Sequence, residues 1–290
     1  GARVMSRKPS SAAPVVRPQR ISPGSARSLL LTLLGEFVLP AQQPTWTAQL
    51  LHGLAGVGVA EKAARQAIAR AASAGWTESE SNGRRIAWRV SERGRRLVAE
   101  GSKRLRSLSD NEAAWDGNWL ILHISLPESR RVDRLRMYRA LSWIGCGNPT
   151  PGVWINPHTG RAGEAGRLIE ELKLGRHTLA FTARSLEFGI PRGELVAKAW
   201  NLEIVAAHYE RVVRRFSVMR PRAGDEALFT YIRLVNELQR LPSIDPGLPK
   251  DLLPPGWDRR RHAGQLWALR EAWRKPAHER WDALAAEFSA

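Results

Sequence analysis

Apolar residues in the first third of the chain recur at helical spacing in three successive runs. The first run covers about residues 25–40, where leucines and a phenylalanine fall on one face until a proline ends it. The second covers residues 48–54, with Thr47 in the position of an N-cap. The third covers about residues 60–74, with apolar residues on one side and cations on the other, and Gly75 follows it as a C-cap. We therefore expect three helices, with a glycine-rich turn between the second and the third.

Two short strands are expected next, because residues 76–81 and 86–90 flank the dipeptide Asn82-Gly83. Asn-Gly between alternating segments is the strongest short-range signal for a β-hairpin. The apolar residues of the second strand should pack inward, namely Ile86, Trp88 and Val90. Helix, helix, turn, helix and hairpin is the order of a winged helix-turn-helix. In such domains the third helix enters the major groove, and the hairpin tip contacts the phosphates or the minor groove.

The middle of the chain alternates between strand and helix patterns. The expected elements are a strand at 118–126, a helix at 131–143, a strand ending at 156, a helix near 164–173 and a strand at 177–182. This order predicts a small ferredoxin-like α+β unit with at least three strands.

The last third of the chain has an almost wholly helical pattern. Amphipathic helices are expected at 195–216 and 225–241, followed by a helix pair from 261 to 288 that Pro276 interrupts. The proline-rich segment 245–257 is too apolar to be only a linker, and we expect it to pack across the helices. The complete pattern predicts a multidomain α+β protein: a disordered basic arm at 1–22, a winged helix-turn-helix at 23–112, a ferredoxin-like domain at 113–192 and a helical C-terminal domain at 193–290.

Charge and composition favour an anionic partner. The chain has 45 Lys and Arg against 28 Asp and Glu, a net charge of +17, and residues 1–115 are per residue more than twice as basic as the rest. Part of this charge could reflect GC-rich coding, which favours arginine and alanine. The single cysteine, Cys146, excludes an internal disulfide and fits a reducing cytoplasm. No apolar run approaches the roughly 20 residues that span a bilayer, so we expect no membrane association.

Cations and amides on the third helix and at the hairpin tip are the candidate DNA contacts. Arginine and glutamine are the side chains that read guanine and adenine edges, and the hairpin arginines are suited to phosphates. The candidates are Lys62, Arg65, Gln66, Arg70 and Ser73 on the helix, with Arg84 and Arg85 at the hairpin tip. The alternative is a hairpin whose arginines serve only solubility.

Several dispersed motifs resemble those of the PaaX-type transcriptional repressors, a bacterial family that controls phenylacetate catabolism. The motifs are Ala74-Gly75-Trp76 with Gly83-Arg84-Arg85 and Ser91-Glu92-Arg93-Gly94, then Ala114-Trp115-Asp116-Gly117-Asn118-Trp119, then Asp245-Pro246-Gly247-Leu248-Pro249 with Leu252-Leu253-Pro254 and Trp257. The resemblance covers the chain from about residue 25 to its end. It implies a winged helix, a middle domain akin to a CRISPR-associated endoribonuclease fold and a helical C-terminal domain. It also implies a homodimeric repressor that releases double-stranded operator DNA when an acyl-CoA, typically phenylacetyl-CoA, binds.

The kinship of the middle domain raises the alternative of a metal-dependent nuclease. Nucleases of that fold use an acidic residue at the end of the first strand, whereas the strand expected at 118–126 contains no carboxylate. Asp116 lies before that strand, in a turn where bonding to local amides is the simpler role. The seven histidines show no zinc-binding spacing, and no nucleotide-binding or nucleophile motif is present, so we expect no enzyme activity, no metal and no cofactor.

An acyl-CoA effector requires cations for its phosphates and an apolar pocket for its acyl group. Two clusters in the C-terminal region combine arginines with aromatic residues, and their candidate members are Arg211, Arg214, Arg215, Arg259, Arg260 and Trp267. Solvated helix faces beside core aromatics would give the same pattern. A nucleic-acid-binding scaffold without a small-molecule switch is the remaining alternative.

Overall fold

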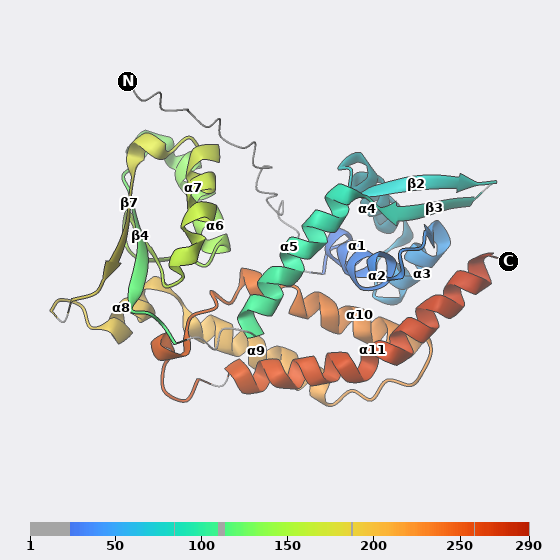
Figure 1. The fold of residues 1–290 in the computed structure, drawn as a ribbon. Helices are drawn as coiled ribbons and strands as arrows, with labels where there is room; N and C mark the ends of the chain where they lie inside the picture. Colours follow the sequence, from blue (N-terminus) through green and yellow to red (C-terminus); the bar gives the residue numbers. More distant parts are fainter. Residues whose placement is uncertain (1–23, 84, 110–113, 187, 258, 290) are drawn as a thin grey trace, which may run out of the picture.

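Two small antiparallel sheets lie at opposite ends of the molecule, and long helices run between them (Figure 1). The computed structural model describes residues 24–83, 85–109, 114–186, 188–257 and 259–289. The expected arm at 1–22 and the hairpin residue Arg84 lie outside the described residues. Among the described helices, none is both long and apolar enough to cross a membrane.

The N-terminal part has the predicted order of helix, helix, turn, helix and hairpin. Its elements are α1 (Ala26–Leu33), a π-helical segment (Leu34–Val38), α2 (Leu39–Ala41), β1 (Thr45–Trp46), α3 (Thr47–Gly56), α4 (Glu61–Ser73), β2 (Thr77–Asn82), β3 (Arg85–Val90) and α5 (Glu92–Ser109). Helix α1 begins where the Ser25 side chain accepts a hydrogen bond from the amide of Ser28. Helix α4 ends in a C-cap at which Gly75 adopts a φ of 69°, as predicted from the glycine.

The hairpin corrects two expectations. Ile86 is 45% exposed, whereas its neighbour Ala87 is buried. Strand β1 has only two residues and pairs with Trp88 and Ala87 of β3. Ile86 therefore lies beyond the end of β1. Thr47 does not cap α3, whose N-cap is Trp46 with no side-chain hydrogen bond. The Thr47 hydroxyl instead donates to the carbonyl of Ile86 and accepts from Trp88 Nε1, which fixes α3 to the hairpin.

The middle part is a four-stranded sheet with the ferredoxin-like order. Its elements are β4 (Asn118–Ile124), a short 3-10 turn (Glu128–Arg130), α6 (Arg131–Trp143), β5 (Gly147–Thr150), β6 (Val153–Asn156), a second 3-10 turn (Thr159–Arg161), α7 (Ala162–Glu171), a third (Gly175–His177) and β7 (Thr178–Arg184). The sheet order is β5-β6-β4-β7, and all neighbouring strands are antiparallel. Alternate residues of β4, including Leu120 and Leu122, face a core formed with α6 and α7. Strand β7 is an edge of this sheet.

The C-terminal part is helical, with two differences from the expected boundaries. Its elements are α8 (Arg192–Ala199), α9 (Leu202–Ser217), α10 (Asp225–Leu238), 3-10 turns at Leu241–Ser243 and Lys250–Leu252, and α11 (Arg259–Ser289). The helix expected at 195–216 is two helices, because Trp200 has an extended backbone. Pro276 lies inside α11 and does not end it, although the helix bends along its length (Figure 1). Buried contacts on this stretch, including Trp273, Ala277 and Trp281, hold the helix across the proline.

One hydrophobic core joins the N-terminal helices to the C-terminal helices. Leucines of α1 and α3 lie in the same buried cluster as residues of α9, α10 and α11. Phe37 stacks on Trp281 with ring centroids 4.8 Å apart, and Glu36 accepts hydrogen bonds from Tyr231 and Arg270. The predicted boundaries at residues 112 and 192 stay a prediction, but the first and third segments are not separate in packing. The segment 245–257 packs as expected, with Leu248 and Leu252 buried.

Candidate nucleic-acid interface

Helix α4 presents one polar face to solvent and buries the opposite face. Ala64, Ala67, Ile68 and Ala71 are buried at helical spacing. The exposed residues on the other side form what we call the α4 face: Lys62, Arg65, Gln66, Ala69, Arg70 and Ser73. A shallow open depression of about 580 Å³ lies along this face and is lined by Glu61, Lys62, Arg65, Gln66 and Ala69. The structure therefore brings together all five helix residues predicted from the sequence.

The cations of the α4 face are available for a new partner. Arg65 pairs with Glu61 at 2.7 Å, but both side chains are more than half exposed. Such a pair contributes only about 0.3–0.5 kcal/mol, so a phosphate or a base edge can displace it. At the other end of the helix, Arg27 stacks over Trp76 at 4.3 Å. Burial lowers the pKa of Arg27, and the nearby charge of Arg70 lowers it further. Two cations therefore lie close together at this end of the helix.

The described arginines of the hairpin already have partners within the protein. Arg85 Nη1 donates to the carbonyl oxygens of Phe288 and Ser289 at 2.9 and 2.7 Å, at the C-terminal end of α11. Arg89 pairs with Glu80 across the hairpin. Arginine at a helix C-terminus satisfies free carbonyls and the negative end of the helix dipole, so Arg85 has a structural role here. The α4 face is therefore the main candidate for the interface.

The middle sheet lacks the acidic site of a metal-dependent nuclease among the described residues. Asp116 accepts hydrogen bonds from the backbone amide and the side-chain amide of Asn118, at 2.8 and 2.9 Å. These two bonds lower the pKa of its carboxyl group, as does the charge of Arg184. The local role predicted for Asp116 is confirmed. Within the described parts of the chain, no three potential ligand side chains cluster as a metal site requires.

The six residues predicted for effector binding lie on two helices, α9 and α11. Arg211, Arg214 and Arg215 are exposed on α9, and Arg211 lies 2.5 Å from His208 Nδ1. Arg259 is buried and pairs with Asp245 at 3.1 Å, so its guanidinium already has a counter-ion inside the protein. Arg260 and Trp267 lie on α11, where the guanidinium of Arg270 covers the Trp267 ring.

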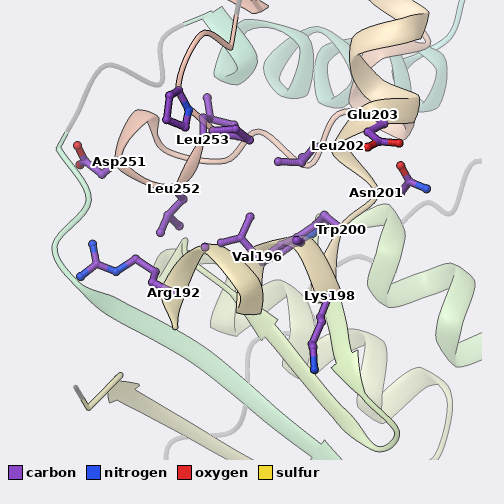
Figure 2. A pocket seen from close by; sticks show the side chains of 14 residues that line it. Arg192, Val196, Lys198, Trp200, Asn201, Leu202, Glu203, Asp251, Leu252 and Leu253 are labelled. Carbon is purple, nitrogen blue, oxygen red and sulfur yellow. The ribbon is translucent and has the colours of Figure 1, made fainter. Parts of the chain in front are cut away.

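A cleft of about 750 Å³, which we call the α8 cleft, opens between α8, the start of α9 and the loop after residue 250 (Figure 2). Its lining comprises Arg192, Gly193, Val196, Ala197, Lys198, Trp200, Asn201, Leu202, Glu203 and residues 251–255. Val196, Leu202 and Leu252 are buried in its wall, while charged side chains stand at its rim. Asp251 accepts a hydrogen bond from the Trp115 amide at 2.9 Å, and Arg192 covers the Trp115 ring at 5.3 Å.

Sequence reasoning missed the α8 cleft because its walls come from segments about 50 residues apart. One signal was present: the proline-rich segment 245–257 was too apolar for a linker. A volume of about 300–1,000 Å³ with apolar walls and a few polar groups is typical of small-molecule sites.

Comparison with known proteins identifies the family. Three family models match in order: "PaaX-like protein" over residues 25–94, "PaaX protein central Cas2-like domain" over 112–195 and "PaaX-like protein C-terminal domain" over 200–283. The transcriptional repressor PaaX of Escherichia coli K12, a regulator rather than an enzyme, is 28% identical over 247 residues, covering 81% of this chain and 76% of the repressor. The structure of protein Rv0674 from Mycobacterium tuberculosis shares the fold, with a TM-score of 0.59 at 22% identity over 90% of this chain and 98% of that one. This protein therefore belongs to the PaaX family.

Proposed function

We propose that this protein is a sequence-specific DNA-binding transcriptional repressor, that it acts as a homodimer in the cytoplasm, and that an acyl-CoA such as phenylacetyl-CoA relieves repression. The observation that carries the proposal is the exposed α4 face, which lies on the second helix of a helix-turn-helix in a PaaX-family chain. A helix in this position fits the major groove, and its side chains are those that bind base edges and phosphates.

Within this proposal, Arg65 and Gln66 read bases, and Lys62, Arg70 and Ser73 contact the backbone of double-stranded operator DNA. Arg84 and Arg85 lie next to the phosphates from the hairpin. Arg85 reaches a phosphate only by releasing the carbonyl groups of Phe288 and Ser289.

The edge of the middle sheet supports dimerisation. Five large apolar side chains on β7 and the segment after it are each more than half exposed: Leu179, Phe181, Leu186, Phe188 and Ile190. We call them the β7 edge patch. An exposed apolar edge strand is an aggregation hazard unless another chain covers it. A second copy of this chain, paired at β7, would cover the patch.

The α8 cleft supports effector binding. Its apolar walls suit an acyl group, and Arg192 in its lining suits a phosphate, whereas the Lys198 side chain pairs with Glu194 at 3.1 Å and points away from Leu252 and Leu253 (Figure 2). We assign the effector to this cleft in preference to the arginines of α9 and α11. The cleft lies where α8, after the middle sheet, meets the C-terminal helices, so a ligand there would contact both parts.

The DNA arm of the test measures binding by fluorescence anisotropy. The probes are a duplex selected by the full chain from a randomised pool and a scrambled duplex of equal length. Arg65→Ala should reduce affinity for the selected duplex by about 5- to 150-fold, the value of one lost bidentate contact of about 1–3 kcal/mol. Arg167→Ala, an exposed arginine of α7, should leave affinity unchanged. Equal affinity of the wild-type protein for both duplexes would refute sequence-specific binding.

The effector and dimer arms use substitutions of matched exposure. Ala197→Trp fills the α8 cleft and should abolish release of DNA by phenylacetyl-CoA, whereas Ala207→Trp, exposed on α9 outside the cleft lining, should not. Release that persists in the Ala197→Trp variant would exclude the cleft.

Phe181→Glu should convert the dimer to a monomer in sedimentation velocity. Val218→Glu, a change at a side chain that is 76% exposed and lies outside the β7 edge patch, should not. A Phe181→Glu dimer would exclude the β7 edge patch.

A further inference from the structure

Two rows of side chains interlock where α3 leads into the turn before α4. Asp225, Phe229 and Arg233 follow one another at intervals of four residues and so lie on one side of α10. His52 and Gly56 have the same spacing at the end of α3. Because these rows come from segments more than 160 residues apart in sequence, the contact links the helix-turn-helix to the C-terminal helices.

The contacts between the two rows are close and specific. His52 Nε2 lies 3.1 Å from Asp225 Oδ2, and Asp225 Oδ1 accepts a hydrogen bond from Arg280 Nε at 2.7 Å. The Phe229 ring lies against Gly56 so closely that a Cβ atom at residue 56 would be 2.1 Å from two of its carbon atoms. Gly56 has no positive φ, so glycine is required here for this close approach rather than for backbone conformation.

Arg233 completes the end of α3. The Leu54 and Ala55 carbonyls accept hydrogen bonds from amides of the turn that follows. The carbonyl of Gly56 accepts from Arg233 Nη2 at 2.6 Å. A guanidinium at a helix C-terminus satisfies a carbonyl and interacts favourably with the helix dipole. The end of α3, and with it the turn to α4, is therefore fixed by a side chain of α10.

We propose that this row of α10 sets the orientation of α4, with Phe229 and Arg233 as positioning residues for DNA recognition. The inference rests on the proposed DNA-binding function. Base readout depends on side chains held to within a fraction of an ångström, whereas phosphate attraction tolerates a displaced helix. Displacing the turn should therefore reduce specific binding while non-specific binding persists.

The test compares Gly56→Ala with Gly264→Ala in the full chain. A Cβ at Gly56 meets the Phe229 ring, whereas one at Gly264, in helix α11, meets no atom within 4 Å. Gly56→Ala should reduce affinity for the selected duplex at least 10-fold and change affinity for the scrambled duplex less than 2-fold. Gly264→Ala should change neither.

Arg233→Met provides a second measurement that adds no atoms to the turn. It removes the hydrogen bond to Gly56 and should also reduce the ratio of specific to non-specific affinity, at a temperature where thermal unfolding shows that the variant is folded. A parallel loss on both duplexes would indicate a merely structural role and overturn the proposal. If Arg65→Ala lowers the ratio but neither Gly56→Ala nor Arg233→Met does, only the positioning role fails. If the wild-type protein shows no preference for the selected duplex, both proposals fail.

Discussion

Asp245 joins three parts of the C-terminal region through a buried carboxylate. Its Oδ2 atom accepts a hydrogen bond from the Tyr209 hydroxyl at 3.0 Å, and its Oδ1 atom accepts from the Gly247 amide at 2.8 Å and from Arg259 Nη1 at 3.1 Å. The side chains of Arg259 and Asp245 are only 7% and 2% exposed. Because neither charge can be hydrated, each depends on the other.

Asp245→Asn leaves the buried Arg259 guanidinium without its counter-ion and should cost about 3–5 kcal/mol of unfolding free energy. With an m-value of about 3 kcal/mol/M, the urea midpoint followed by circular dichroism should fall by about 1–1.7 M. The double variant Asp245→Asn/Arg259→Met removes both charges and should recover most of this loss.

The exposed pair of Arg222 and Glu226 is the matched control, because the Arg222 side chain is 91% exposed. Glu226→Gln should leave the urea midpoint nearly unchanged, because exposed ion pairs contribute little to stability. A loss for Asp245→Asn as small as that for Glu226→Gln would refute the buried ion pair. So would a double variant less stable than Asp245→Asn alone.

Three further predictions concern burial and backbone. Burial raises the pKa of the Cys146 thiol from 9.0 to about 11, so the unfolded chain loses this proton first and unfolding free energy should fall as pH rises from 9 to 11. Cys146→Ala should remove that slope; an unchanged slope would contradict the assignment. Burial lowers the pKa of His158, His208 and His278, so the unfolded chain takes up protons first and stability should fall as pH drops below about 6.5. His208→Gln should flatten this acid slope in urea titrations, and a steeper slope would count against it. Pro276→Ala restores a backbone donor inside α11 and should raise Tm, with a gain of up to about 3 kcal/mol; a lower Tm would show that the proline ring contributes more by packing.

Features with local causes were predicted well from the sequence. Helix α4 was expected at 60–74 and spans Glu61–Ser73, because alanine spacing and Gly75 mark both its buried face and its end. The hairpin at Asn82-Gly83 and the strand and helix order of the middle sheet followed from turn chemistry and hydrophobic period in the same way. The residues of the α4 face were predicted correctly as exposed for the same reason, because the spacing of apolar residues along an amphipathic helix shows which side is exposed.

Features that depend on distant segments were predicted poorly. The sequence did not reveal the hydrogen bonds of Arg85 to two carbonyl groups of α11, because these partners are more than 200 residues away. Arg259 looked like an effector contact because the sequence does not reveal that Asp245 neutralises it inside the core. Pro276 was expected to end a helix, but tertiary contacts on both sides of it hold α11 together.

The common core of the first and third segments limits how this regulator can be redesigned. A chimera that exchanges only residues 23–112 for those of a relative would place foreign side chains against α9, α10 and α11, and would place Phe229 against whatever residue the relative has in place of Gly56. Under the proposed function, transfer of a DNA preference between members of the family requires a graft that is discontinuous in sequence and that includes α9, α10 and α11. The middle sheet has its own core on one face, but its other face shares a buried cluster with the C-terminal region, in which Trp119 and Ile155 lie with Leu202 and Leu248, so a graft of this sheet would have to preserve that contact.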